Sequence, residues 1–553
     1  MPSTSVYISD LNELVGRSLD GDELTSALFG CKAELEGIEG DEAKVEIKDS
    51  NRIDLLSTEG IARTLKGYLG IETGLPKYGA GPSGIKIQVD QSVGEIRPYV
   101  VACCARGVEL SDETLISYMN LQEKIHLTYG RGRKRMAIGF YDLDLISPPI
   151  RYLITPPDEN AFVPLGMDEE MTPREILEEH PKGRDYAHLL KGFDGYPMLL
   201  DSKDQVLSMP PIINSNTLGK ITHMTRNLFV EATGSRFDVL SLGLNVLATS
   251  LADRGGDLQS VELNYQSGTR ITPELAPGNS TLAPGLCNRL LGLNLPKKEI
   301  VKLLRKARFG ARSERGGIRV KVPPYRGDIM HQTDLVEEVA IMHGYGRFEP
   351  IDPMLPTIGR TDQLEDFTDA IRELMVGMGF QEVMTFVLTS PENVLDRMGG
   401  RDTEYVEIEN PSTSSHSIFR PDLMPSIMEF LGYNAHVSYP QRVFECGDAV
   451  ELAGGECRTS RKLCLAWGDS KVNFTEIKAV IEFIIRTLGL ECSLNEITDP
   501  AFILGRAAGI VVGGESLGIA GEVHPGVLDS WQIPVPVLAA EMDIQALRDL
   551  VYR

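Results

Sequence analysis

Four acidic side chains stand close together in the segment PPYRGDIMHQTDLVEEVAIMHGYG, residues 323–346. They are those of Asp328, Asp334, Glu337 and Glu338. If a helix begins near Asp334, positions i, i+3 and i+4 share one face, so the last three carboxylates converge. Carboxylate oxygens are the ligands that Mg²⁺ and Ca²⁺ prefer in proteins. The spacing is therefore compatible with a hard-cation site, although the sequence contains no EF-hand loop.

Helix capping explains the same residues without a metal. Asp334, followed three residues later by Glu337, resembles a capping box, and acidic groups are favourable near a helix N-terminus. Glu338 would then face solvent. An apolar stripe on the adjacent face should bury this helix, and it consists of Leu335, Val339 and Met342. The residues alone leave the metal and the capping interpretations open.

The elements that must position these groups belong to a multidomain α+β chain. A length of 553 residues predicts about three or four domains. Two stretches rich in Gly or Pro, residues 74–84 and 349–359, are typical of boundaries. With the alternation of helical and strand-like patterns, they predict an N-terminal mixed domain, a larger α+β domain, a small domain with a basic helix, and a C-terminal α+β domain. The expected ranges are 1–75, 85–265, 268–350 and 360–553.

Composition narrows the class of protein. No apolar run reaches the ~18 residues needed to span a membrane, and the N-terminus lacks the pattern of a signal peptide. The eight cysteines form no C-x-x-C pair, as expected of a reduced cytoplasmic protein. There is no G-x-x-x-x-G-K-[ST], G-x-G-x-x-G or H-E-x-x-H motif, so local motifs support neither nucleotide nor zinc chemistry.

The formal net charge of −24 argues against a general nucleic-acid-coating role, because phosphate repels an acidic surface. Two basic segments still allow a selective contact, namely Arg131–Arg135 and Lys297–Arg308. The second is expected to be an amphipathic helix, for which a solvated basic face is the ordinary interpretation. Its apolar stripe consists of Ile300, Leu303, Leu304 and Ala307.

Several stretches, in order along nearly the whole chain, resemble one family. They include NRIDLLSTEGIARTLKGYLG (51–70), LQEKIHLTYGRGRKRMAIGFYDLD (121–144), HPKGRDYAHLL (180–190), LSMPPIINSNTLGKITHMTRNLFVEATG (207–234) and the acidic segment described above. The C-terminal part adds ENPSTSSHSIFRPDLMPSIMEFLGYN, YPQRVFECGDAVEL and IAGEVHPGVL. Together they are similar to the phenylalanine–tRNA ligase beta-subunit family in its archaeal and eukaryotic form.

The resemblance implies an enzyme that attaches phenylalanine to tRNA(Phe) as an alpha2-beta2 tetramer. The alpha subunit is expected to bind ATP and to carry the aminoacylation site, so this chain should carry none. The beta subunit is expected to contain an α+β editing domain at 85–265 that hydrolyses mischarged Tyr-tRNA. It should also contain a small metal-bearing domain and a C-terminal class II synthetase-like antiparallel-sheet module.

The C-terminal module is expected to lack catalytic motifs. A class II core binds ATP through an Arg-plus-acid strand motif and a later Gly-rich motif that ends in Arg. Here only RVFECGD (442–448) resembles the first, and GGESLGIAGEVHPGVL (513–528) offers glycines without a following Arg. A nucleotide site without that Arg loses its clamp on the triphosphate. The module is therefore interpreted as a structural partner for the alpha subunit.

The resemblance also implies site residues. It favours Mg²⁺ bound by Asp328, Asp334, Glu337 and Glu338, while leaving capping available to Asp334 and Glu337. For the editing pocket it implies Leu199, Ser208, Glu231 and Thr233. Members of the family often have Asp where this chain has Glu231, which changes the reach of the carboxylate by one methylene. Ordinary strand-end hydrogen bonding is the alternative explanation for Ser208 and Thr233.

A second class of function stays in view, a non-catalytic tRNA-binding scaffold or regulator derived from such a subunit. It would be favoured by loss of the carboxylate cluster or of the 207–234 pocket. Both are intact in this sequence.

Overall fold

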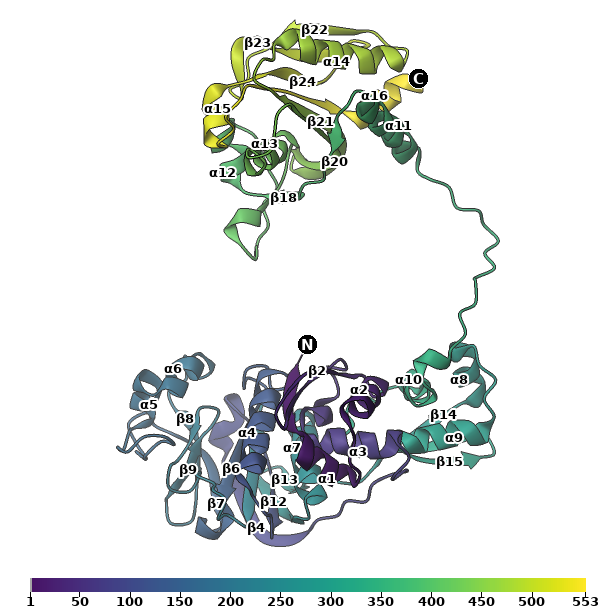
Figure 1. Cartoon of the computed structure of the whole chain (residues 1–553). Helices are drawn as coiled ribbons and strands as arrows, with labels where there is room; N and C mark the ends of the chain where they lie inside the picture. Colours follow the sequence, from purple (N-terminus) through teal and green to yellow (C-terminus); the bar gives the residue numbers. More distant parts are fainter. Residues whose placement is uncertain (1) are drawn as a thin grey trace. The chain divides into compact units, whose positions relative to one another are not determined.

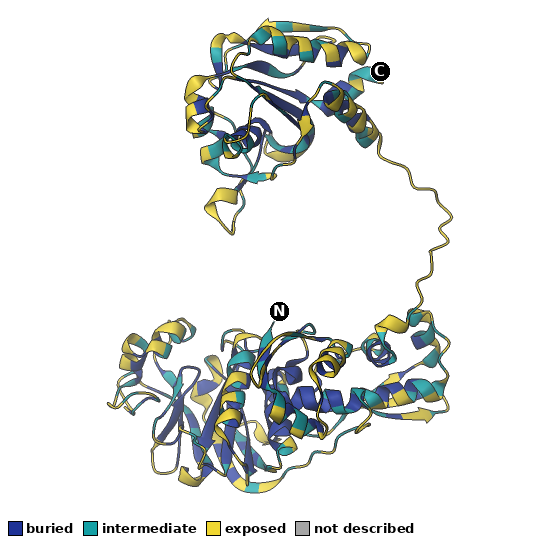
Figure 2. Ribbon diagram, viewed as in Figure 1, coloured by how far each residue is buried: buried dark blue, intermediate teal, exposed yellow. Residues whose placement is uncertain are grey.

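The computed structural model describes residues 2–553, which form two compact units, one ending at Ile351 and the other starting at Asp352 (Figure 1). Each unit has sheets of its own with buried residues at its centre (Figure 2). The mixture of helices with several sheets confirms the expected α+β multidomain class. None of the helices among the described residues is long and apolar enough to cross a membrane.

The first unit begins with a three-stranded sheet in the order β1-β3-β2, accompanied by three helices. The strands are β1 (Ser3–Tyr7), β2 (Ala33–Glu39) and β3 (Glu42–Ile47), and the helices are α1 (Ile8–Val15), α2 (Gly21–Gly30) and α3 (Thr58–Tyr68). Ser57 caps α3, because its Oγ accepts a hydrogen bond from the N–H of Gly60 at 2.9 Å.

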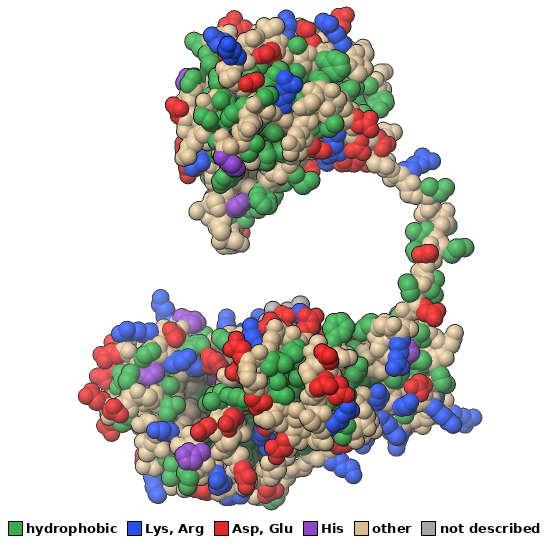
Figure 3. Space-filling view, viewed as in Figure 1, with side chains coloured by type: hydrophobic (Ala, Val, Ile, Leu, Met, Phe, Trp, Pro, Cys, Tyr) green, Lys and Arg blue, Asp and Glu red, His purple; other side chains and the backbone are tan. Residues whose placement is uncertain are grey.

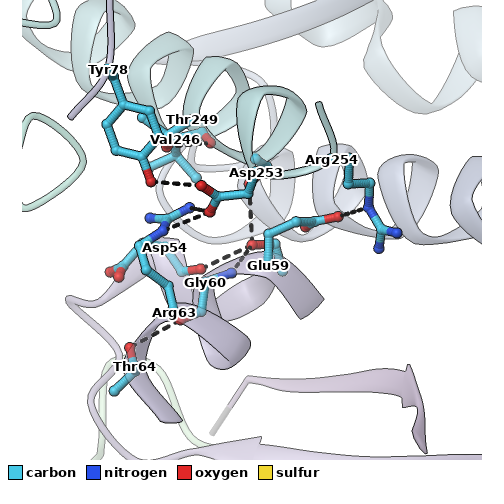
Figure 4. Close-up of polar contacts among 12 residues, drawn as sticks. Asp54, Glu59, Gly60, Arg63, Thr64, Tyr78, Val246, Thr249, Asp253 and Arg254 are labelled. Carbon is cyan, nitrogen blue, oxygen red and sulfur yellow. Dashed lines mark hydrogen bonds and ion pairs between the residues drawn. The ribbon is translucent and has the colours of Figure 1, made fainter. Parts of the chain in front are cut away.

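Ion pairs made by two buried residues of α3 attach this helix to α7 (Phe237–Asp253) of the following domain (Figure 4). The Nε of Arg63 donates to Asp253 at 2.8 Å, and the Tyr78 hydroxyl donates to the other oxygen of the same carboxylate at 2.8 Å. Arg254 pairs with Glu59, which is 1% exposed. Because removal of one partner would leave a buried charge unpaired, these contacts hold the N-terminal sheet on α7.

A ten-stranded sheet forms the centre of the first unit, in the order β10-β9-β8-β7-β4-β12-β5-β11-β6 with β13 paired to β12. Its strands are β4 (Gly81–Val89), β5 (Tyr99–Arg106), β6 (Met136–Asp142), β7 (Ile150–Thr155), β8 (Tyr196–Leu200), β9 (Val206–Met209), β10 (Ile213–Asn214), β11 (Leu228–Gly234), β12 (Asp257–Tyr265) and β13 (Gly268–Thr272). The β12–β13 hairpin carries this sheet to Thr272, across the expected boundary between 265 and 268.

Two long helices, α4 (Asp112–Leu127) and α7, cover one face of this sheet, and they share a core with Val101, Val230 and Ala232. The other face carries a second core around Tyr141 and Phe229. Two short helices, α5 (Pro173–Glu179) and α6 (Pro181–Tyr186), lie between β7 and β8 in the chain.

The last part of the first unit is a small sheet in the order β14-β16-β15 with three helices. The strands are β14 (Gly278–Leu282), β15 (Gly310–Glu314) and β16 (Gly317–Val322), and the helices are α8 (Pro284–Leu291), α9 (Lys297–Lys306) and α10 (Gln332–His343). The apolar stripes expected on α9 and α10 are both buried. Lys and Arg side chains gather over α9 and β15 on the face shown in Figure 3.

The second unit is built on a seven-stranded sheet in the order β17-β20-β21-β25-β24-β23-β22, antiparallel except between β17 and β20. The strands are β17 (Gln381–Glu382), β20 (Gln441–Ala453), β21 (Glu456–Gly468), β22 (Cys492–Glu496), β23 (Phe502–Val512), β24 (Glu515–Val523) and β25 (Val537–Asp543). Two short strands, β18 (Leu388–Thr389) and β19 (Ile418–Phe419), pair separately.

Helices cover both faces of the seven-stranded sheet. One face carries α11 (Gln363–Gly377), α14 (Phe474–Thr487) and α16 (Ile544–Val551), whose apolar residues share a core with Phe444 and Leu463. The other face carries α13 (Met424–Tyr433), which packs with Val443 and Ala539. Short helices α12 (Pro391–Val394) and α15 (Pro525–Ser530) complete this side. The alternation of buried residues along the strands explains why the sheet supports two cores.

Candidate functional site

Tyr141 joins two of the predicted site residues. Its hydroxyl lies 2.7 Å from Oγ of Ser208 and 2.9 Å from Oε1 of Glu231. All three side chains are nearly inaccessible to solvent, with exposed fractions of 0%, 1% and 2%. They come from β6, β9 and β11. The three side chains therefore form one buried polar cluster beside the core around Phe229.

This cluster lies where the two ends of the ten-stranded sheet meet. β6 stands at one end of the strand order and β9 and β10 at the other, yet Tyr141 on β6 contacts Ser208 on β9. The side-chain amide of Asn214 on β10 also donates to the carbonyl of Phe140 on β6 at 3.2 Å. The sheet is thus curved enough to bring its ends together, as in a partly closed barrel.

Gly139 makes room for the cluster. It lies opposite Glu231 in the β6–β11 pairing. A Cβ at this position would lie 2.3 Å from the Tyr141 hydroxyl and 2.7 Å from the Glu231 carboxylate. Both distances are far shorter than van der Waals contact, so a side chain here would displace the phenol or the carboxylate.

The second oxygen of Glu231 is available for a ligand. Tyr141 contacts Oε1, whereas Oε2 is buried without a hydrogen-bond partner in the described structure. Burial raises the pKa of Glu231 to about 7, while the hydrogen bond from Tyr141 and the charge of Arg97 act in the opposite direction. A buried acceptor without a partner is costly, so this atom is well suited to receive a hydrogen bond from a ligand.

A cavity of about 500 Å³ lies next to Glu231 and Ser208. The volume is in the range usual for small-molecule sites. Its walls are largely apolar, with Ile138, Phe140, Pro210, Ile212 and Ile213 among the lining residues. Three cationic side chains also line it, those of Arg133, Lys182 and Lys220. The cavity therefore combines an apolar wall with two carboxylates, those of Glu123 and Glu231, and with three cationic side chains.

Glu123 and His126 of α4 line the cavity on the side near Arg133, and hydrogen bonds hold both side chains in place. The backbone N–H of Ile138 donates to Nε2 of His126 at 2.8 Å, so the neutral ring carries its proton on Nδ1, which lies 3.3 Å from Glu123. Burial lowers the pKa of His126. The hydrogen bond from His126, assisted by the charge of Arg133, lowers the pKa of Glu123 to about 2 against the effect of burial.

Thr233 and Leu199 lie near this cluster but do not line the cavity. Thr233 accepts hydrogen bonds from Arg97, at 3.2 Å through Oγ1 and 2.5 Å through its carbonyl. Leu199 pairs with Ser208 across β8 and β9 and belongs to the core around Tyr141. In this structure Thr233 orients a neighbouring guanidinium, and Leu199 supports the strand that carries Ser208.

The residues that sequence reasoning missed came from segments that it had assigned elsewhere. Arg133 belongs to the first basic segment, but it is 8% exposed and donates to the carbonyls of Pro211 and Ile212. Tyr141 lies in the stretch 121–144, which contributed to the family resemblance but supplied none of the expected site residues. The sequence contains one signal for this cluster. Gly139 and Tyr141 are two positions apart in a strand, so they lie on the same face of the sheet.

The four carboxylates expected to bind Mg²⁺ are divided among different partners. Asp328 accepts two hydrogen bonds from Arg326, at 2.7 and 2.5 Å, and Glu338 accepts one from the same guanidinium at 2.5 Å. Arg52 lies 3.8 Å from Glu338 and also pairs with Asp54. Although burial opposes it, Arg326 lowers the pKa of Asp328.

The other two carboxylates point to separate groups. Asp334 completes a capping box with His331, because its Oδ2 accepts the N–H of His331 at 2.6 Å. The helix thus begins two residues before Asp334, which is the third residue of the helix and not its cap. Glu337 pairs with Lys32 and accepts a hydrogen bond from Tyr345 at 2.8 Å.

These carboxylates do not fit a shared Mg²⁺ in this arrangement. Guanidinium groups occupy the position that a cation would take between Asp328 and Glu338, and the described residues contain no cluster of three acidic, His or Cys side chains able to hold a metal. The magnesium site stays a prediction from the sequence.

In the second unit, the Arg of the expected nucleotide motif is used for packing. The guanidinium carbon of Arg442 lies 3.8 Å from the ring centre of Trp467. The acidic residue of the same motif, Glu445, pairs with Arg420 at 2.8 Å. Neither side chain is presented as a free clamp for a triphosphate.

Two family models match the chain. Residues 280–345 match the tRNA synthetase B5 domain, and residues 351–544 match the phenylalanyl tRNA synthetase beta chain CLM domain. The chain is 44% identical over 556 aligned residues to a phenylalanine–tRNA ligase beta subunit from Pyrococcus horikoshii, covering 99% of this chain and 100% of that one. A beta subunit from Archaeoglobus fulgidus is 42% identical, with 99% of each chain covered.

A solved structure matches the first part of the chain. It is the crystal structure of an N-terminal fragment of the phenylalanyl-tRNA synthetase beta subunit from Pyrococcus horikoshii, 43% identical with a TM-score of 0.61. The match covers 62% of this chain and 100% of that fragment.

Proposed function

The chain belongs to the family of phenylalanine–tRNA ligase beta subunits, and from this premise we propose that its first unit hydrolyses tyrosine wrongly attached to tRNA(Phe). As a member of this family it is a component of an aminoacyl-tRNA synthetase. The editing activity is this chain's own contribution, and it takes place in the cavity beside Ser208 and Glu231.

The observation that carries the proposal is the buried, unpartnered Oε2 of Glu231 next to the cavity. A tyrosine side chain entering along the apolar wall would bring a phenol O–H to this acceptor. The hydrogen bond between Tyr141 and Oε1 holds the carboxylate in place. The extra methylene of Glu relative to Asp is accommodated by this contact, which secures one oxygen and leaves the other free.

The same arrangement protects the correct product. Phenylalanine lacks the hydroxyl and would leave Oε2 unpaired after water has been excluded from the cavity. A site built to hydrogen-bond a substrate hydroxyl rejects the analogue that lacks it by about 10⁴–10⁵-fold, whereas an apolar pocket rejects an added hydroxyl only ~100-fold. Glu231 therefore supplies a hydrogen-bond acceptor for the substrate hydroxyl, which a pocket that selects phenylalanine lacks.

The positive charges at the cavity fit a nucleic-acid substrate. Lys182 and Lys220 line it although the whole chain carries a net charge of −24, whereas Arg133 is already paired with Glu123. Local cations attract the phosphates near the aminoacyl end of a tRNA. They would orient the ester so that its amino-acid side chain points to Glu231.

We infer that aminoacylation takes place on an alpha subunit that binds ATP, within an alpha2-beta2 tetramer that binds tRNA(Phe). The stacking of Arg442 on Trp467 supports the inference that this chain has no triphosphate clamp of its own. The second unit also exposes Met384 (93%) and Phe386 (79%), which a partner subunit would cover. Dependence on Mg²⁺ is assigned to the assembled ligase, and cytoplasmic location stays a prediction from the sequence.

The alternative, a tRNA-binding scaffold without catalytic activity, makes a different prediction for one assay. The purified chain, alone and with its alpha subunit, is mixed with Tyr-tRNA(Phe) and with Phe-tRNA(Phe). Editing predicts rapid loss of the tyrosyl ester and slow loss of the phenylalanyl ester. Binding of both tRNAs without hydrolysis of either would favour the scaffold.

A further inference from the structure

A second cavity of about 500 Å³ lies in the second unit, on the same side of the seven-stranded sheet as α13. It is bordered by the β20–β21 hairpin, by β24 and by the end of β25. These strands include both segments that the sequence suggested as remnants of an ATP-binding motif. The proposed editing function does not use this cavity.

One side of the cavity has fewer positive than negative charges. Glu541 is 6% exposed, and its Oε2 accepts the backbone N–H groups of Leu423 and Met424, both at 2.9 Å. Its Oε1 lies 3.5 Å from Nζ of Lys462, but that ammonium is closer to Glu451, at 2.6 Å. One lysine therefore serves two carboxylates.

The other side has the same imbalance. Arg401 lies 3.3 Å from Oδ2 of Asp422, and 3.4 Å from Asp499, which lies outside the cavity lining. One arginine thus also serves two carboxylates. Burial, and after it the charge of Asp422, raises the pKa of Glu541, while the charges of Lys462 and Arg401 act in the opposite direction.

Asp422 provides an unused acceptor at this point. The residue is 9% exposed and lines the cavity, and its Oδ1 is buried without a hydrogen-bond partner among the described residues. Buried polar atoms are rarely left without a partner, and each such atom calls for an explanation. A donor on a bound molecule would satisfy Oδ1 and offset the excess negative charge.

The chemistry of the cavity excludes two classes of ligand. A phosphate or carboxylate would be repelled by the acidic floor. A metal ion would need several converging ligands, and no group of three acidic, His or Cys side chains able to hold one is found in the described part of the chain. The volume also exceeds what a single ion would fill. The remaining class is a small organic cation.

The rest of the lining shows what else that molecule must carry. Apolar residues stand beside the acidic floor, namely Met424, Leu452 and Ile519. We propose that the cavity binds a small molecule with a primary ammonium group and an apolar body, and that Oδ1 of Asp422 accepts a hydrogen bond from the ammonium. Apolar primary amines have this chemistry, whereas a free amino acid adds a carboxylate that the acidic floor repels.

The test uses the full-length chain and isothermal titration calorimetry with four probes: 2-phenylethylamine, L-phenylalanine, 2-phenylethanol and 3-phenylpropanoate. The amine should bind, and the alcohol and the acid should bind at least about tenfold more weakly, because a hydrogen bond to a charged group is lost. L-Phenylalanine should bind more weakly than the amine, because the acidic floor repels its carboxylate, and tighter binding of L-phenylalanine would overturn the proposal.

The variant Asp422→Asn is nearly isosteric and should weaken amine binding by at least about tenfold. Asp402→Asn is the matched control, since it removes the same charge from an exposed residue outside the cavity lining. Equal binding of the amine and the alcohol to the wild-type chain would overturn the proposal without any variant. Unchanged affinity in Asp422→Asn, or no amine binding up to 10 mM, would overturn it as well.

Discussion

The hydroxyl of Tyr141 lies 2.9 Å from the carboxylate of Glu231, so the chain places a phenol of its own against the group that we propose to recognise a substrate phenol. This contact engages Oε1 and leaves Oε2 without a partner. It gives the carboxylate a fixed direction before any ligand arrives, and such preorganisation favours a single binding geometry.

Substitution of Glu231 should separate editing from synthesis. Glu231→Ala removes the acceptor, so hydrolysis of Tyr-tRNA(Phe) should slow by about 10- to 100-fold, as expected for a lost hydrogen bond to a charged group, about 1.5–3 kcal/mol. Phenylalanine charging by the assembled tetramer should change little. Both rates are measured with the purified variant. If Tyr-tRNA hydrolysis is unaltered, Glu231 does not belong to the site.

Tyr141→Phe should slow hydrolysis of Tyr-tRNA(Phe) less than Glu231→Ala does, and the change should fall mainly on one kinetic constant. The ring still fills its place in the core, but Glu231 loses the hydrogen bond that orients it. We expect slower hydrolysis with a larger change in kcat than in KM. Tyr152→Phe is the matched control, since that buried hydroxyl donates to the carbonyl of Arg97 at 2.9 Å. Similar losses in both variants would indicate general loosening of the sheet.

Stability should depend on pH through Glu231. Burial raises its pKa from 4.5 to about 7, so between these pH values the folded chain keeps a proton that the unfolded chain has released. The free energy of unfolding from this group therefore falls as pH rises from about 4.5 to 7. Glu231→Gln should remove this slope and be up to about 3 kcal/mol more stable above pH 7. Denaturant titrations at several pH values measure both curves, and parallel curves would contradict the assignment.

The acidic helix offers a test that separates ion pairing from metal binding. Glu338→Gln takes a negative charge from Arg326 and Arg52 and should cost on the order of 3 kcal/mol. Glu337→Gln, at a side chain that is 45% exposed, should cost about 0.5 kcal/mol. With ion pairing, EDTA leaves the melting temperature of the assembled tetramer unchanged. A fall on chelation that is present in the wild type and absent in Glu338→Gln would establish the magnesium site instead.

The chain alone should form no phenylalanyl-adenylate. Arg442 packs on Trp467, so pyrophosphate exchange dependent on phenylalanine should be at background until an alpha subunit is added. Co-expression with that subunit should restore exchange and charging together. Robust exchange by the isolated chain would contradict the assignment of the aminoacylation site to the partner.

The sequence by itself determined the class, the order of the segments and much of the local structure. The spacing of the apolar residues predicted the amphipathic helices α9 and α10, because the buried side of a helix places apolar residues three or four positions apart. The resemblance to the family rested on stretches spread along the chain, and the relatives confirmed it. These features depend on residues that are close together along the chain, so the sequence alone is enough to predict them.

Only the tertiary structure decided which side chains meet. Tyr141 and Ser208 stand 67 positions apart, and they touch because the sheet curves until its ends join. The carboxylates of the acidic helix converge in sequence, but Arg326 and Lys32 draw them to different partners. Spacing along a chain specifies the face on which a group lies. Which opposite charge or free acceptor it meets depends on strands and helices brought together by packing.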